Sequence, residues 1–239
     1  MKLTISNPIR KRKQLSTKNI LIIEDHPLVY NSYLAAFKTI ESKFTDYKFV
    51  INISENCDDA IKKINESVNN CKIDLVLLDI SIPPSNDKLY LSGEDIGVYL
   101  KEVLPDSKII VLTTFNDNFR IYSIIQNLNP DGFLVKNDVT IEILMEAINK
   151  VISYQTFYSQ SVLELGRKII AQPYVVDKID RQMIYEISKG AKMSELPKKI
   201  PMSIGGLERR KRNLKDIFGL EQSNTDRELI EKAEEIGFL

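Results

Sequence analysis

The chain has 239 residues, of which 43% are hydrophobic, so it is long enough for one large domain or two of ordinary size. Its 33 basic and 33 acidic residues cancel, which excludes a bulk positive field pointing to nucleic acid. One histidine and two cysteines without metal-like spacing exclude most zinc sites, and no apolar run approaches the roughly 20 residues of a membrane span. We therefore expect a cytoplasmic protein that makes no membrane contact.

Strand-like and helix-like segments alternate in the first two thirds of the chain. A basic segment, residues 1–18, comes first, and we expect it to be disordered. Short apolar, mostly β-branched runs then predict strands at 19–23, 48–54, 74–78, 108–114 and 132–135. Apolar residues at helical spacing predict helices at 28–41, 58–68, 96–104, 118–128 and 141–153. This alternation indicates an α/β domain over residues 19–153, a (βα)5 doubly wound parallel sheet with helices on both faces.

The rest of the chain reads as helical. Residues 154–175 predict a linker with one short helix that ends before Pro173, and no further strand is expected. Helical spacing then recurs at 179–190, 194–200, 203–218 and 225–237. The sequence therefore predicts a second, small all-α domain over residues 176–239.

Polar side chains stand where four of the predicted strands end. They are Glu24 and Asp25, Asp79, Thr113, and Lys136. The carboxyl ends of parallel strands share one edge of a sheet, where ligands bind. Clustered carboxylates repel one another and suit Mg²⁺, beside which a carboxylate can act as the nucleophile toward a phosphoryl group. Taken singly, each carboxylate could equally be the cap of a helix and the lysine could be solvated.

Four motifs give the first domain a specific resemblance. LIIEDHP, DLVLLDISIP, IIVLTT and GFLVK together resemble a response-regulator receiver domain. The resemblance implies that Asp79 accepts a phosphoryl group and that Thr113 and Lys136 are the switch hydroxyl and the phosphate-binding lysine. It also implies Mg²⁺ ligands at Asp25, Asp79 and the carbonyl of Ser81, with Glu24 acting through water. Phe133 takes the place of the switch aromatic. Such a protein is a regulator that takes part in its own phosphorylation and dephosphorylation, not an enzyme in the ordinary sense.

The segment after Asp79 departs from this pattern. PPSNDKLYLSG places Gly93 several residues further from the aspartate than the family does. We read residues 81–93 as an enlarged loop beside the site.

The second domain resembles the helix-turn-helix output domain of the NarL/LuxR type. Gly190 fits the end of its first helix, SELPKKI its scaffold helix with Ser194 as N-cap, and MSIGGLERRKRNLKDIFG its recognition helix. Residues 177–220 carry eleven basic and six acidic side chains. A recognition helix enters the major groove with its N-terminal part while basic groups hold phosphates. The candidate DNA-contacting residues are Ser203, Leu207, Glu208, Arg209, Arg210, Lys211 and Arg212. Leu207 also falls at the spacing of Leu214 and Phe218, which would face the core, and a charged helix face can simply be solvated.

These features predict a DNA-binding response regulator. A sensor histidine kinase would phosphorylate Asp79, and a phosphorylation-linked homodimer would bind double-stranded DNA at a two-fold promoter site. The alternative is a phospho-switch whose helical domain binds a protein. A phosphatase with an aspartate nucleophile is disfavoured because Ser81 stands where its second aspartate would be.

Overall fold

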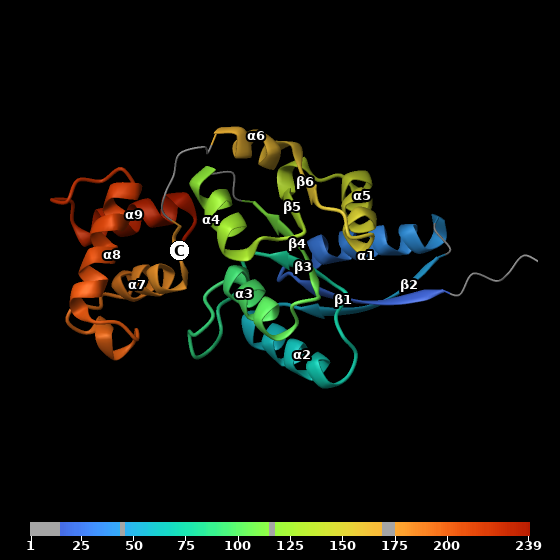
Figure 1. Ribbon diagram of the computed structural model, residues 1–239, viewed down its shortest axis with the longest axis horizontal. Coiled ribbons are helices and arrows are strands. Elements are labelled where there is room, and N and C mark those ends of the chain that lie inside the picture. Colours follow the sequence, from blue (N-terminus) through green and yellow to red (C-terminus); the bar gives the residue numbers. More distant parts are fainter. Residues whose placement is uncertain (1–14, 44–45, 115–117, 169–174) are drawn as a thin grey trace, which may run out of the picture.

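The computed structural model describes residues 15–43, 46–114, 118–168 and 175–239. Six parallel strands form one sheet in the order β2-β1-β3-β4-β5-β6 (Figure 1). The strands are β1 (Ser16–Ile23), β2 (Tyr47–Ser54), β3 (Leu75–Asp79), β4 (Lys108–Thr113), β5 (Gly132–Val135) and β6 (Phe157–Tyr158). The expected doubly wound α/β class is confirmed.

Helices cover both faces of this sheet. They are α1 (Pro27–Lys43), α2 (Cys57–Asn69), α3 (Gly93–Val103), α4 (Asn118–Leu128) and α5 (Ile141–Ile152). Side chains of α1 and α5 form one core with one face of the sheet, and those of α2, α3 and α4 form a second core with the other face. The central strands are buried on both sides, which explains why their sequences are continuous apolar runs.

The remaining helices follow β6. They are α6 (Gln160–Lys168), α7 (Lys178–Ser188), the 3₁₀ helix η2 (Leu196–Lys198), α8 (Ile204–Ile217) and α9 (Asp226–Ile236). We call residues 16–158 the sheet-bearing part and residues 175–239 the helical part. Apolar side chains of α7, η2, α8 and α9 form a third core. No helix among the described residues is both long and apolar enough to cross a membrane.

Local sequence signals explain where these helices begin and end. Asp177 and Thr225 each form a reciprocal capping box with the residue three positions later. The Ser203 hydroxyl accepts a hydrogen bond from the amide of Gly206, so Ser203 is the N-cap of α8 as predicted. Gly190 has a φ of 85°, a left-handed conformation that suits glycine just after a helix.

The structure differs from the sequence expectations in three places. The expected disorder of residues 1–18 is wrong for Ser16, Thr17 and Lys18, which belong to β1, whereas residues 1–14 lie outside the described residues. The chain after α5 forms β6, which adds a sixth strand beside β5. The expected scaffold helix is one 3₁₀ turn with Glu195, not Ser194, at its N-cap. Pro197 lies in the first turn, where a missing amide hydrogen costs little, but Pro201 follows closely and prevents the segment from continuing as a helix.

Candidate functional site

The acidic edge predicted from the strand ends is formed in the structure. Lys136 Nζ lies 2.7 Å from Asp79 Oδ2 and 2.7 Å from Glu24 Oε2. The amide of Ser81 donates to Asp79 Oδ1 at 3.0 Å. The pairing of β1 with β3 aligns Ile23 with Leu78, which places Glu24 beside Asp79. The sheet register therefore brings together three groups that are far apart in the sequence.

Burial and charge shape the ionisation of this cluster. Glu24 is fully buried, and burial raises the pKa of its carboxyl, although the hydrogen bond from Lys136 opposes the rise. Burial by itself lowers the pKa of the Lys136 ammonium, but the charge of Asp79 and the hydrogen bonds to both carboxylates leave that pKa raised. Lys136 is therefore a firmly held cation between two carboxylates.

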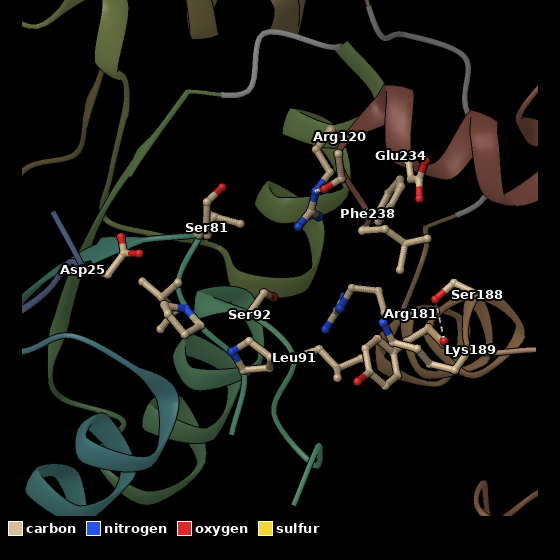
Figure 2. A pocket seen from close by; sticks show the side chains of 17 residues that line it. Asp25, Ser81, Leu91, Ser92, Arg120, Arg181, Ser188, Lys189, Glu234 and Phe238 are labelled. Atoms are coloured by element: carbon tan, nitrogen blue, oxygen red, sulfur yellow. Dashed lines mark hydrogen bonds between the residues drawn. The ribbon is translucent and has the colours of Figure 1, made fainter. Parts of the chain in front are cut away.

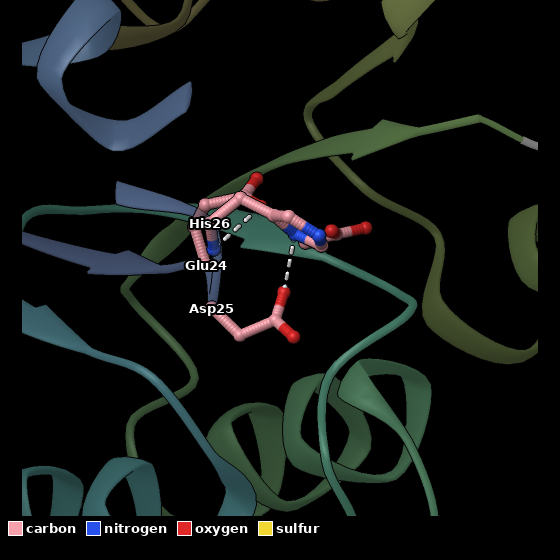
Figure 3. Close-up of side chains that lie close together, drawn as sticks. Glu24, Asp25 and His26 are labelled. Carbon is pink, nitrogen blue, oxygen red and sulfur yellow. Dashed lines mark hydrogen bonds and ion pairs between the residues drawn. The ribbon is translucent and has the colours of Figure 1, made fainter. Parts of the chain in front are cut away.

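The side chains that follow β1 extend the cluster toward solvent (Figure 3). His26 Nδ1 lies 2.7 Å from Asp25 Oδ1 and 3.3 Å from Glu24 Oε1. Oxygen or nitrogen atoms of Glu24, Asp25, His26 and Asp79 all lie within 4.8 Å of one another. Asp25 Oδ1 is buried, and it faces the ring nitrogen of His26. A donor set dominated by carboxylate oxygens fits a hard divalent cation such as Mg²⁺.

Tyr33 is a neighbour of the cluster that sequence reasoning missed. Its hydroxyl donates to Glu24 Oε2 at 3.4 Å from the buried face of α1. Burial and the charge of Glu24 raise the pKa of this phenol, so it remains a hydrogen-bond donor. Tyr33 lies six residues after Pro27, the first residue of α1, and the sequence shows it only as part of an amphipathic helix.

The two predicted switch residues lie in the core beside the cluster. Thr113 is buried at the end of β4, one residue beyond Leu112, which pairs with Asp79. Phe133 on β5 pairs with Val111 and packs fully buried in the core shared with α4.

The enlarged loop ends in an unusually close backbone contact. The amide of Gly93 donates to the carbonyl of Ile80 at 2.9 Å. A methyl group added at Gly93 would lie 1.9 Å from the carbonyl oxygen of Asp79, so only glycine fits here. The first turn of α3 is thus hydrogen-bonded to the backbone of Ile80 and packed closely against that of Asp79, the candidate phosphoryl acceptor.

The helical part presents a smaller polar surface than the sequence indicated. Glu208, Arg209 and Arg212 are exposed on α8, and Ser203 and Gly205 are exposed at its start. Leu207 is fully buried in the core with Leu214, so the structure places it behind this surface and not on it.

Two further candidate residues are held by ion pairs inside the helical part. Arg210 Nη1 lies 2.9 Å from Asp177 and 3.0 Å from Asp180, and Lys211 pairs with Asp226. Because these partners are distant in sequence or in separate helices, the basic run alone could not reveal them.

Known proteins are similar to this chain over both its sheet-bearing and its helical part. No family model matches it. Its sequence is 22% identical over 226 residues to the oxygen regulatory protein NreC of Staphylococcus aureus strain JH9, covering 90% of this chain and 95% of NreC.

Solved structures of RcsB match the whole architecture. RcsB from Salmonella enterica serovar Typhimurium, bound to promoter rprA with the phosphomimetic BeF3⁻, has a TM-score of 0.63 at 22% identity, covering 92% of this chain and 99% of that one. A structure of two RcsB dimers bound to two parallel DNAs has a TM-score of 0.55 at 22% identity, covering 92% of this chain and 100% of that one. This chain therefore has the same fold as RcsB over both of its parts.

The similarity in fold covers the helical part as well as the sheet-bearing part. The sheet-bearing part ends at Tyr158, so a match over 92% of the chain includes helices beyond it. In the sheet-bearing part, the acidic cluster lies at the carboxyl edge of the sheet, and in the helical part Ser203 is the N-cap of α8.

Proposed function

We propose that this chain is a DNA-binding response regulator whose phosphoryl acceptor is Asp79. The observation that carries the proposal is the Lys136 ammonium, which lies 2.7 Å from Asp79 within the acidic cluster. A sensor histidine kinase would be the donor, and the reaction would take place in the cytoplasm. The proposed receiver spans residues 19–153, the linker 154–175 and the DNA-binding domain 176–239.

Residues of this chain would each have a part in phosphoryl transfer. A carboxylate oxygen of Asp79 attacks phosphorus, the phosphorus–nitrogen bond to the kinase histidine breaks, and an acyl phosphate forms on Asp79. Lys136 then pairs with the phosphoryl oxygens, and Thr113 donates a hydrogen bond to one of them. Asp25 and Asp79, with the Ser81 carbonyl and Glu24, would hold Mg²⁺, which neutralises charge on the incoming group.

Magnesium is expected to stabilise the folded receiver. Ligand bound only to the folded state adds about 2.7 kcal/mol at a hundred times its dissociation constant. We expect MgCl₂ to raise the thermal unfolding midpoint of the wild-type chain, and Asp25→Asn to remove most of that rise because one anionic ligand is lost.

The exposed carboxylate of Asp106 offers a matched control for this experiment. Its side chain is 84% exposed and pairs only loosely with Lys72, so Asp106→Asn should respond to MgCl₂ as the wild type does. A rise of the same size in Asp25→Asn would exclude Asp25 as a ligand.

The outer surface of α8 would contact DNA as part of a phosphorylation-linked homodimer. Arg209 and Arg212 are exposed and suited to phosphates, whereas Arg210 and Lys211 would support the helix through their ion pairs. Gly205 has no neighbour within 4 Å, although glycine costs about 1 kcal/mol in a helix. That open space would let the DNA backbone approach closely.

The steepness of salt dependence tests this role. When a protein binds DNA through phosphates, the logarithm of the binding constant falls linearly with the logarithm of the salt concentration. Each phosphate neutralised adds about 0.9 to the steepness of this line. We expect genomic fragments bound by the wild-type chain to show this dependence, and Arg212→Ala to reduce the slope by about 1. The binding constant would be measured by gel shift at salt concentrations from about 50 to about 200 mM, where the affinity changes steeply.

Arg227→Ala is the control for the loss of one arginine. Arg227 is 85% exposed on α9, where it pairs with Glu231, and it is not one of the candidate DNA-contacting residues. Its slope should equal that of the wild type. Absence of salt-dependent binding to any genomic fragment would instead favour a protein partner for the helical part.

A further inference from the structure

The two parts of the chain meet at a buried cluster of charged side chains. Arg181 of α7 places Nη1 2.7 Å from Glu94 Oε1 and Nη2 2.6 Å from Asp95 Oδ1. Arg120 of α4 pairs with Glu94 and donates through Nε to the carbonyl of Gly237 at 3.0 Å. All four charged side chains are at most 4% exposed. The cluster therefore joins the first turn of α3 and the helix α4 to two places in the helical part, α7 and the segment after α9.

Apolar and backbone contacts surround these ion pairs. The ring of Phe119 on α4 contacts those of Phe218 and Phe238 edge-on, each with centroids 6.0 Å apart. Asn127 of α4 donates to the carbonyl of Val176 at 2.8 Å. Arg120 and Arg181 both line a cavity of about 500 Å³ whose lining also includes Ser81 and Phe238 (Figure 2). The joint thus combines charge pairing with a shared apolar core.

The enlarged loop is built into the same joint. Ser85 and Tyr90 are hydrogen-bonded across its tip, where the Ser85 amide donates to the Tyr90 carbonyl at 2.8 Å. The Tyr90 ring faces Lys178 Nζ of the helical part at 4.7 Å, a favourable cation–π contact. The amide of Leu91 donates to Asp95 Oδ2 at 2.8 Å, which orients that carboxylate for Arg181. The additional residues therefore supply contacts to the helical part that a short loop would lack.

Docking of the two parts leaves the start of α8 accessible. Glu208, Arg209 and Arg212 are exposed while the joint is closed. In Figure 1, α8 lies at the outer end of the molecule, with α7 and α9 nearer to the sheet. The joint accordingly sets the orientation of this helix without covering its polar face.

We propose that the enlarged loop and the first turn of α3 are a docking surface for the helical part of this same chain. The dock holds α8 in one orientation relative to the receiver, so that two paired chains present it to both halves of a two-fold DNA site. Buried ion pairs demand exact geometry because an unpaired charge in the interior is costly, and they suit an orienting contact. The DNA half of this inference rests on the proposed function. The docking half does not.

Arg181→Ala tests the dock in the full-length chain. Without Arg181, Glu94 and Asp95 lose their partner in the helical part, so the joint should open. The apolar core of each part should remain intact, because Arg181 is solvated when the two parts separate. We expect small-angle scattering, measured without DNA, to show a larger radius of gyration than for the wild type. Binding to two-fold fragments recovered from the genome with the wild-type chain should weaken about tenfold, as expected when a linked second contact loses its geometry. Binding to the same fragments with one half scrambled should stay unchanged.

Two further variants keep the test decisive. Tyr90→Ala removes the loop's ring contact with Lys178 and should act in the same direction with a smaller effect. Arg227→Ala removes an arginine from the same part at an exposed site and should change neither measurement. An unchanged radius of gyration in both Arg181→Ala and Tyr90→Ala would overturn the dock. Tighter DNA binding by Arg181→Ala would overturn the orienting role, because the joint would then restrain binding. If no DNA binds to the wild-type chain, the proposed function fails while scattering still decides the docking surface.

Discussion

Replacing Asp79 with asparagine is expected to abolish phosphoryl uptake by this chain. The variant keeps a side chain of the same shape at the end of β3, but an amide cannot act as the nucleophile. After incubation with acetyl phosphate and MgCl₂, intact-mass measurement should show one added phosphoryl group on the wild type and none on Asp79→Asn. The expected loss is complete because no other described carboxylate has both the Lys136 ammonium and the Ser81 amide as partners.

Asp106→Asn is the control for this substitution, since it changes an exposed carboxylate far from the cluster. It should accept the phosphoryl group as the wild type does. A phosphoryl group retained on Asp79→Asn would show that another residue is the acceptor. In a separate experiment, genome-wide mapping of the DNA bound by the wild type and by Asp79→Asn would show whether phosphorylation changes the occupancy of the binding sites.

Gly93→Ala is expected to destabilise the receiver by about 3 kcal/mol or more, the upper range for overpacking. The added methyl group would lie 1.9 Å from the carbonyl oxygen of Asp79, and the obstacle is backbone, which cannot rotate away as a side chain can. The first turn of α3 would have to move, and with it the carboxylates of Glu94 and Asp95. Urea unfolding should show a midpoint well below that of the wild type.

Gly205→Ala is the matched control, the same change in a helix where nothing lies within 4 Å. There alanine should raise stability by up to about 1 kcal/mol through its higher helix propensity. Equal stabilities for Gly93→Ala and the wild type would show that α3 is not packed closely against Asp79 as the structure has it. The pair of variants separates the effect of close packing from that of glycine itself.

Much of the fold could be predicted because its signals are local. The apolar runs of the strands, the spacing of the helices, and the caps at Asp177, Ser203 and Thr225 each involve residues a few positions apart. The acidic edge could also be predicted, since parallel strands deliver their carboxyl ends to one side of the sheet. Leu214 and Phe218 were placed in the helical core by spacing alone, and both are buried.

Other features left no local signal. The two-residue strand β6 is too short for periodicity to register, and it exists because β5 offers it an open edge. The scaffold segment carries apolar residues at helical spacing, but its prolines limit it to a 3₁₀ turn. The sequence allowed Leu207 either to contact DNA or to face the core, and in the structure it is buried in the core of the helical part.

By itself, the sequence determined the class of the sheet, the edge where its carboxylates gather, and the helices that follow. Only the tertiary structure decided how the two parts are joined and which basic side chains remain exposed. Arg181 is 87 residues from Glu94, and Lys211 pairs with a residue of a different helix. Ion pairs between such distant residues form only after the chain has folded, because packing brings them together and burial makes their pairing necessary.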